Sequence, residues 1–312
     1  MSLTWPIVFM GTPEAAAVSL EFLLKGPDPV VGVVTQPDRP AGRGQKRVPS
    51  PVRRVTESRR IPVLTPEKIR DPDFLNTIKS WAPQLIVVVA YGRILPRSVL
   101  ELPPQGCLNV HYSLLPKYRG AAPIAWTILN GEGKSGVTTM SLVERMDAGP
   151  ILLQEEVSLD QDETAASLEA KLIPVGAHLL LETISGLKNG RITPRSQREE
   201  ESTYAPMLKK EDGRIDWTQP AKAIERRVRA LYPWPSAYTY LKGKLLKVYR
   251  TVVITAGEKG PAGEVVKADG GSLWIATGQG ILSLEEVQIE NRKRLPAAEF
   301  LKGARIEKGE RL

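Results

Sequence analysis

The sequence is poor in the residue types that build metal centres, disulfides and membrane spans. Its 312 residues include one cysteine, Cys107, and two histidines, His111 and His178. A single cysteine excludes an internal disulfide and a zinc-ligand set of cysteines, so we expect no metal. No apolar run approaches the roughly 20 residues that a membrane helix needs, and residues 1–6 do not resemble a secretion signal. We therefore expect a cytoplasmic protein that does not contact a membrane.

The glycine-rich loops of nucleotide-binding proteins are also missing. The turn after the first expected strand, at residues 11–14, has only one of the three glycines of the dinucleotide fingerprint. A nicotinamide cofactor is therefore disfavoured, because the other two glycines admit the pyrophosphate and allow close helix packing. The chain also lacks the G-x-x-x-x-G-K-S/T loop, so ATP is not implied.

Short β-branched, apolar runs alternate with helical patterns over the first two thirds of the chain. We expect strands at residues 6–10, 30–35, 85–90, 106–111 and 136–143, and helices at 13–25, 66–81 and 163–187. Pro174 inside the last of these predicts a kink or a break. This alternation predicts an α/β, Rossmann-like fold with a mostly parallel sheet and helices on both faces. Ligands bind such sheets at the carboxyl ends of the strands.

The last third of the chain has a different pattern. Residues 191–201 are polar and weakly periodic, and residues 237–255 and 263–287 alternate as short strands separated by glycine. We expect a catalytic domain at 1–190, a linker at 191–207, and a small C-terminal β-barrel, OB-like domain at 208–312. Small barrels of this kind often bind nucleic acids.

The excess positive charge is concentrated in the same third. The net charge is +8, with 43 Lys+Arg and 35 Asp+Glu. From residue 203 onward there are 20 Lys+Arg and 13 Asp+Glu, which leaves 23 and 22 for the rest, so the excess is +7 against +1. This asymmetry favours a polyanionic partner, although solubility alone also explains many basic domains.

A second basic feature is the segment at residues 35–51, which exceeds the usual strand-to-helix connection of about 2 to 6 residues. It contains one acidic residue, Asp38, and four basic residues: Arg39, Arg43, Lys46 and Arg47. Such a segment is either a solvated surface loop or an arm that engages phosphates.

Asn109 and His111 stand at the end of an expected strand, where catalytic groups of α/β folds are found. Side chains alternate along a strand, so these two share one face and Val110 packs on the other. An asparagine amide can donate to a developing oxyanion, and an imidazole can accept or donate a proton near neutral pH. A lone histidine at a strand end is also often structural. Cys107 lies near, but a cysteine in a strand is often a small buried hydrophobe.

The motif NVHYSLLP at residues 109–116, the RGAAP that follows at 119–123, and Asp147 downstream resemble the folate-dependent formyltransferases. Two other segments and a short motif narrow the resemblance to members that act on methionyl-tRNA: QPDRPAGRG at 36–44, DGRIDW at 212–217 and PWP at 233–235. The resemblance spans nearly the whole chain.

The resemblance implies transfer of a formyl group from 10-formyltetrahydrofolate to the α-amino group of methionine on initiator tRNA, for translation initiation. It places Asn109, His111 and Asp147 in the catalytic positions. It also implies that the folate site is lined by Ser113, Leu114, Leu115 and Pro116. Formyl-folate is already an activated acyl donor, so the reaction needs no metal.

One position departs from the family pattern. The family usually carries a lysine where Met207 stands in YAPMLKK, at residues 204–210. Its role in tRNA binding must fall to Lys209 or Lys210, or be absent. The sequence leaves open whether His111 is a general base or an oxyanion donor. A formyltransferase or hydrolase acting on a small molecule and a non-catalytic RNA-binding module are the rival functions, and we expect a monomer.

Overall fold

The structure is a computed structural model that describes residues 4–41, 46–255 and 260–312, with only the backbone described for 39–41 and 46. The chain forms two compact units. Unit 1 combines Met1–Pro123, Lys134–Ser158 and Ala170–Ala205, and unit 2 combines Ile124–Gly133, Leu159–Glu169 and Pro206–Leu312.

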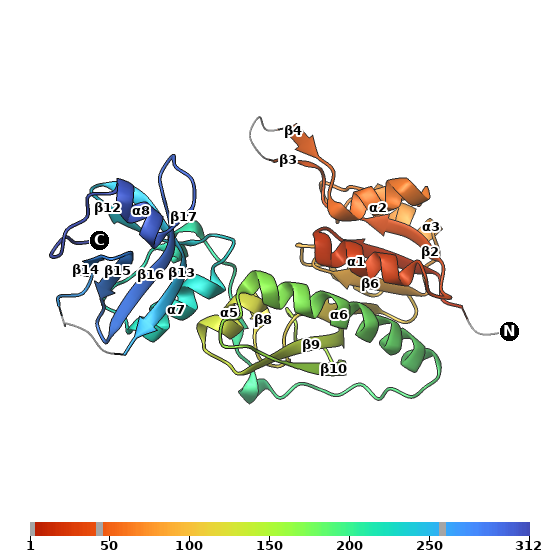
Figure 1. Cartoon of the computed structure of the whole chain (residues 1–312). Coiled ribbons are helices and arrows are strands. Elements are labelled where there is room, and N and C mark those ends of the chain that lie inside the picture. The colour runs from red at the N-terminus through yellow and green to blue at the C-terminus, as the bar shows by residue number, and fades with distance from the viewer. Residues whose placement is uncertain (1–3, 42–45, 256–259) are drawn as a thin grey trace. The chain divides into compact units, whose positions relative to one another are not determined.

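Unit 1 is built on a seven-stranded sheet (Figure 1). The strands in spatial order are β10 (Ile151–Ser158), β9 (Lys134–Ser141), β7 (Cys107–His111), β6 (Leu85–Val89), β1 (Ile7–Gly11), β2 (Val30–Val34) and β5 (Val63–Leu64). The five strands from β7 to β5 are parallel, whereas β9 pairs antiparallel with β7 and with β10. The chain crosses from one side of β1 to the other between β5 and β6, which creates a topological switch point beside β1.

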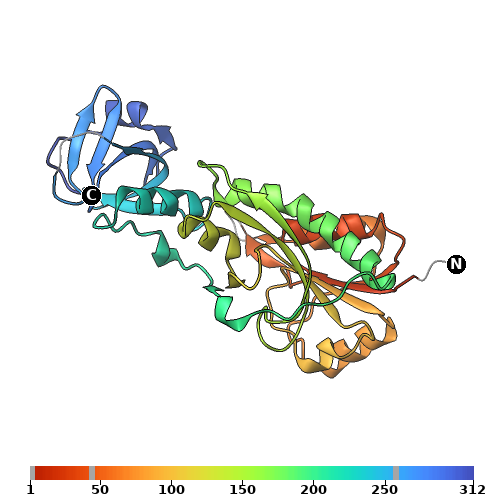
Figure 2. The same cartoon turned by 90° about the horizontal axis from the view of Figure 1, so that it is seen from below.

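Helices cover both faces of this sheet because its central strands are apolar on both faces. On one face α3 (Pro72–Ser80) buries Phe74 and Ile78 against Val8 and Met10 of β1. Figure 2 shows α1 (Glu14–Leu23) and α6 (Ala165–Lys188) together on the other face. The rings of Phe22 in α1 and His178 in α6 pack edge to face, with their centroids 4.9 Å apart. The prediction of a Rossmann-like sheet covered on both faces is confirmed.

Helix α6 is capped at its start and contains an internal proline. The Oγ1 atom of Thr164 accepts a hydrogen bond from the backbone N–H of Ser167, so this threonine caps the start of the helix. Gly190 has a φ of +64°, which suits the end of a helix. Pro174 does not break the helix, which runs through it as one element.

The segment at residues 35–51 contains a short hairpin rather than an irregular loop. Its strands are β3 (Arg39–Ala41) and β4 (Lys46–Val48), which pair antiparallel and project from unit 1 in Figure 1. The hydroxyls of Thr35 and Ser50 lie 2.8 Å apart at its base, and Ser50 caps α2 (Pro51–Arg59). An ion pair of 2.6 Å between Asp38 and Arg53 joins the hairpin to the same helix.

The polar segment after α6 packs along unit 1. Arg195 forms an antiparallel bridge with Ile151, and β11 (Tyr204–Ala205) pairs parallel with β8 (Arg119–Gly120). A two-stranded sheet is therefore closed by residues about 85 positions apart. Short sequence windows do not predict a pairing over that separation.

Unit 2 contains a six-stranded antiparallel sheet. The strands in spatial order are β12 (Ala237–Leu241), β13 (Lys244–Ile254), β16 (Ile281–Ile289), β15 (Ser272–Ala276) and β14 (Val265–Asp269), with β17 (Leu295–Pro296) pairing with β16. Ile224 and Val228 of α7 (Ala221–Ala230) and Phe300 of α8 (Ala297–Gly303) enter the core of this sheet. The expected C-terminal β domain is thus an antiparallel sheet flanked by two helices.

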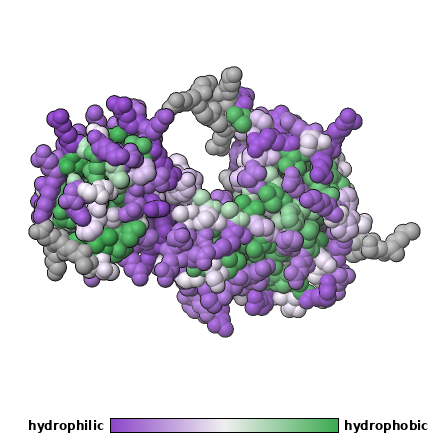
Figure 3. All heavy atoms as spheres, viewed as in Figure 1, coloured by the Kyte–Doolittle hydropathy of each residue, from purple (hydrophilic) through white to green (hydrophobic). Residues whose placement is uncertain are grey.

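Hydrophobic side chains lie between hydrophilic ones on the face that Figure 3 shows. None of the helices in the described parts of the chain is long and apolar enough to cross a membrane.

Candidate active site

His111 ends strand β7, where its ring is held by the loop that follows. The ring is almost fully buried, and its Nε2 atom lies 2.9 Å from the carbonyl oxygen of Tyr118. A carbonyl only accepts hydrogen bonds, so Nε2 carries the hydrogen in this contact. The lone pair of the neutral ring is then on Nδ1, which faces Asp147.

Asn109 lies two residues earlier on the same face of β7. Its side chain is buried, with 9% of the residue exposed. No hydrogen bond engages its amide within the described parts of the chain, and the amide atoms are not among the fully buried side-chain atoms that lack a partner. The opposite face of the strand behaves as the alternation predicts, because Val110 and Tyr112 approach Gly176 of α6. Asn109 therefore presents an uncommitted amide beside His111.

Asp147 comes from the turn between β9 and β10 and completes this group. Its Oδ2 atom lies 3.7 Å from Nδ1 of His111 and accepts a 2.8 Å hydrogen bond from the backbone N–H of Gly120. The 3.7 Å separation is too long for a direct hydrogen bond. Nδ1 of His111 and Oδ2 of Asp147 therefore face each other as two hydrogen-bond acceptors, and one donor group of a ligand can bond to both.

Two residues of the site have an unusual backbone conformation. Asp147 has a φ of +49° and Tyr118 a φ of +62°. Asparagine and aspartate tolerate this left-handed region, but a bulky tyrosine does so at a cost of about 1 to 3 kcal/mol. Tyr118 is held there by the contact of its carbonyl with His111 and by its N–H, which donates to Oγ1 of Thr203.

The four residues expected to line a folate site differ in exposure. Ser113 and Leu115 are buried: the Ser113 hydroxyl donates to the carbonyl of Lys117, and Leu115 packs with Met140 and Ile151. Leu114 and Pro116 are half-buried. Leu114 and Pro116 can therefore contact a ligand through their side chains, whereas Ser113 and Leu115 hold the loop in place.

Three residues that the sequence did not assign to the site, Arg119, Gln197 and Glu199, form a hydrogen-bond network that reaches the backbone of Asp147. Arg119 is 1% exposed, and its guanidinium donates to Gln197 and to Glu199. The hydrogen bond from Arg119, supported by one from Arg145, lowers the pKa of the Glu199 carboxyl below its usual value. The sequence identified Arg119 only as part of the RGAAP motif. No pattern in the sequence predicts that it contacts residues near position 200.

Cys107 shares the strand face of Asn109 and His111 but takes no part in the site. Its thiol faces α4 (Arg97–Leu100), with Sγ 3.8 Å from the carbonyl oxygens of Val99 and Leu100. Burial raises the pKa of Cys107 to about 12, so the thiol stays protonated at neutral pH. A nucleophilic role needs the thiolate, and the structure disfavours it.

The expected tRNA-binding residues are divided between the two units. Arg47 is exposed on β4 in unit 1, and Lys209 and Lys210 are exposed in unit 2. Arg43 lies outside the described residues, as do the side chains of Arg39 and Lys46. Met207, which stands where a lysine was expected, is 73% exposed.

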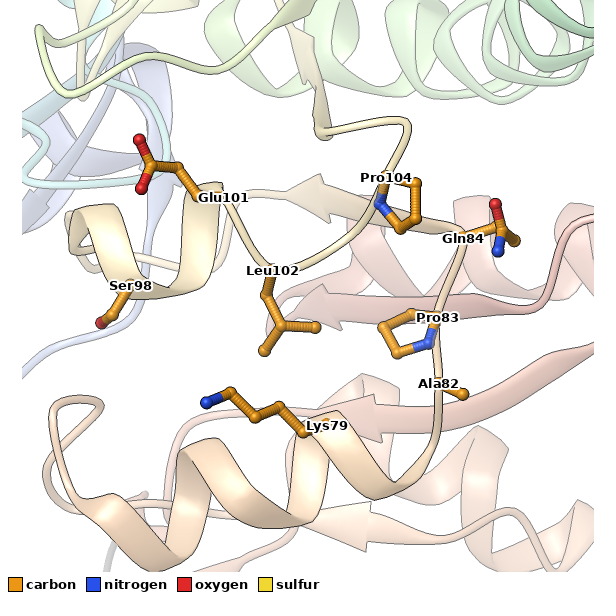
Figure 4. Close-up of a pocket in the computed structure, with 8 residues that line it drawn as sticks. All are labelled: Lys79, Ala82, Pro83, Gln84, Ser98, Glu101, Leu102 and Pro104. Atoms are coloured by element: carbon orange, nitrogen blue, oxygen red, sulfur yellow. The ribbon is translucent and has the colours of Figure 1, made fainter.

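Other features of the described chain offer less chemistry. No group of three or more His, Cys, Asp or Glu side chains within the described ranges could hold a metal ion. Figure 4 shows a shallow pocket lined by residues that include Lys79, Gln84 and Leu102. It lies where β6 and β7 begin, which is the edge opposite His111. Ligands of parallel sheets bind at the carboxyl ends, so this pocket is not the candidate site.

Comparison with known proteins identifies the family and agrees with the fold. The family model described as formyl transferase matches residues 6–184, and the model of the formyl transferase C-terminal domain matches residues 207–305. These matches define the class as a formyl transferase.

The chain is 47% identical over 306 residues to the methionyl-tRNA formyltransferase of Geobacter sulfurreducens, covering 98% of this chain and 96% of that one. It is 49% identical over 300 residues to that of Desulfotalea psychrophila, covering 96% and 93%. The chain therefore belongs to the methionyl-tRNA formyltransferase family.

Solved structures share the fold at lower identity. A structure of HypX from Aquifex aeolicus in complex with tetrahydrofolic acid matches with a TM-score of 0.62 and 22% identity, covering 96% of this chain and 47% of that one. The N-formyltransferase from Helicobacter canadensis, in complex with folinic acid and dTDP-3-aminofucose, matches with a TM-score of 0.66 and 19% identity. That match covers 91% of this chain and 99% of the other.

Proposed function

We propose that this protein transfers the formyl group of 10-formyltetrahydrofolate to the α-amino group of methionine esterified to initiator tRNA. The observation that carries the proposal is the uncommitted, buried amide of Asn109 beside His111, whose Nδ1 faces Asp147 at 3.7 Å. Family membership supplies the substrates, and this arrangement supplies the chemistry of acyl transfer.

The first requirement is a neutral amine. We assign His111 as the general base through Nδ1, because Nε2 already donates to the carbonyl of Tyr118. Asp147 presents a second acceptor 3.7 Å away, so the two atoms can orient the hydrogens of the amine and share its proton. Once protonated, the imidazolium is stabilised by the Asp147 carboxylate. General-base catalysis contributes about 10² to 10⁴ in rate.

The second requirement is stabilisation of the charge on the formyl oxygen. The folate cosubstrate supplies an activated formyl group. The amine nitrogen forms a bond with the formyl carbon, the oxygen becomes negative, and the Asn109 amide donates a hydrogen bond to it. The bond between carbon and the folate nitrogen then breaks, and that nitrogen gains a proton as the amine loses one. An oxyanion donor of this kind is worth about 3 to 4 kcal/mol in the barrier.

We assign Ser113 to Pro116 to the folate site, with the half-buried Leu114 and Pro116 as the side chains that contact it. The hairpin β3–β4 with Arg39, Arg43, Lys46 and Arg47 is assigned to the tRNA. Lys209 and Lys210 are assigned to the same partner. The hydrogen bond and ion pair at the base of the hairpin support a role as a held arm rather than a solvated loop.

We assign the chemistry to residues 1–190, connected through 191–207 to a tRNA-binding part at 208–312. The excess of seven positive charges from residue 203 onward supports the tRNA assignment. The proposed tRNA substrate belongs to translation initiation, so we propose that the protein acts in the cytoplasm. As expected from the sequence, we propose that the protein is a monomer.

The test is an assay with purified protein, 10-formyltetrahydrofolate and methionyl-tRNA, followed by hydrolysis and detection of N-formylmethionine by mass spectrometry. We expect stoichiometric formation of N-formylmethionine and loss of the folate formyl group. Formate release without N-formylmethionine would indicate a hydrolase instead. Binding of tRNA with no product would indicate an RNA-binding module, and either result would overturn the proposal.

A further inference from the structure

Gln197 lies in the polar segment after α6 and makes four hydrogen bonds at once. Its Nε2 atom donates to the backbone carbonyls of Asp147 and Gly149, both at 2.7 Å. Its Oε1 atom accepts from Nε and Nη2 of Arg119, at 3.0 and 2.9 Å. A primary amide has two donor hydrogens and two acceptor lone pairs, and every one is used here.

The partner of this amide is an unusually buried cation. Arg119 is 1% exposed, and a buried charge must be paired and hydrogen-bonded to be tolerated. Its Nη1 atom donates to both carboxylate oxygens of Glu199, at 3.1 and 3.2 Å, and Glu199 is also paired with Arg145. Arg119 is therefore fixed, and it gives Gln197 a rigid support.

The other end of the network is the turn that carries Asp147. That turn has a φ of +49° at Asp147, and its carboxylate accepts from the N–H of Gly120, the neighbour of Arg119. Gln197 clasps the carbonyls on either side of Ala148, while Gly120 holds the carboxylate. Both contacts lead to β8, because Arg119 and Gly120 are its two residues.

We propose that Gln197 is a positioning residue that sets the Asp147 turn relative to His111. Glutamine is required at this place because glutamate has no hydrogens for the two carbonyls and aliphatic side chains satisfy neither end. The inference rests on the proposed function for its effect on turnover, but its structural part is independent of it. The segment at 191–205 thereby becomes part of the catalytic machinery rather than a connection only.

The test compares Gln197→Met with wild type and with Gln105→Met, an exposed glutamine before β7. We expect kcat to fall about tenfold or more for Gln197→Met, with KM for both substrates within about twofold, because misplacing a catalytic group affects chemistry rather than binding. Gln105→Met should behave as wild type. In an Asp147→Asn background the effect of Gln197→Met should shrink below about twofold, because the two substitutions remove the same contribution. An unchanged kcat, or equal effects in both backgrounds, would overturn the inference.

A second measurement needs no turnover. Amide hydrogen exchange at Gly120 reports the hydrogen bond to Asp147, and it should become about tenfold faster in Gln197→Met. Exchange at Val87, in the centre of the sheet, should not change and shows that the variant is folded. If wild-type protein forms no N-formylmethionine, the proposed function fails, and exchange at Gly120 still decides the network. Unchanged exchange at Gly120 would contradict it.

Discussion

Three side chains on one face of β7 show how environment rather than identity decides a role. Cys107, Asn109 and His111 are all buried and two residues apart. The thiol of Cys107 is protonated and turned to α4, whereas the ring of His111 is fixed by Tyr118 and faces Asp147. Only the Asn109 side chain has no partner within the described residues. An amide that no protein group engages can bond a ligand beside His111, which makes it the strongest single indication of chemistry at this site.

The residue-scale prediction concerns this amide. Asn109→Ala should lower kcat by about 10² to 10³ because the oxyanion donor is lost. The free energy of unfolding should change by less than about 1 kcal/mol, because no intramolecular hydrogen bond is broken. Single-turnover formylation and urea unfolding measure the two quantities. Asn189→Ala, at an exposed position after α6, is the matched control. Wild-type turnover in folded Asn109→Ala would remove Asn109 from the site.

At the scale of elements, the short strand pair β8–β11 shapes the site as much as the large sheet does. The N–H of Arg119 donates to the carbonyl of Thr203, and the N–H of Ala122 donates to that of Ala205. Between them Gly120, with a φ of +120°, passes so close to the other strand that a Cβ atom would lie 2.6 Å from the carbonyl oxygen of Ala205. Glycine is therefore needed there for both conformation and space.

Gly120→Ala tests this element against Gly106→Ala. Gly106 also has a positive φ, of +71°, but nothing lies within 4 Å of its Cβ position. Gly106→Ala should cost about 1 kcal/mol of unfolding free energy from backbone strain alone. Gly120→Ala should cost at least about 2 kcal/mol more, because the backbone of β11 must move. It should also lower turnover, since the N–H of Gly120 holds Asp147. If urea titrations gave the same loss of stability for Gly120→Ala and Gly106→Ala, β11 would have to move at no cost in free energy, which would contradict the prediction.

The sequence predicted the elements whose signal is local. The apolar runs placed β1, β2, β6 and β7 within one or two residues, and the alternation along β7 put Asn109 and His111 on one face. It did not predict β8, β11 or the network of Gln197, because these contacts join residues about 50 to 85 positions apart without any periodicity. The resemblance to the family predicted that Asp147 belongs to the site, and the structure shows which contacts hold it there.

At the scale of the whole molecule, net charge rather than hydrophobicity distinguishes the part of the chain assigned to catalysis from the part assigned to tRNA binding. Residues up to 202 are nearly neutral with 23 positive and 22 negative side chains, whereas the remainder has 20 and 13. We expect exposed lysines and arginines to attract the polyanion, mainly through counterion release.

This division predicts the salt dependence of tRNA binding. Replacing Lys209 and Lys210 together by glutamine should weaken binding and reduce the slope of log K against log salt by roughly 0.7 to 0.9 for each phosphate that is no longer neutralised. The control replaces Lys25 and Lys79, which are exposed in unit 1, and changes the net charge by the same amount. Fluorescence titrations with methionyl-tRNA from about 50 to 200 mM salt measure both. If the two lysines bind phosphates directly, the slope falls only in the first variant, because net charge alone would act on both. Equal slopes in the two variants would remove Lys209 and Lys210 from the tRNA interface, and Met207, exposed two residues earlier, would then mark a place where this chain does without a cation.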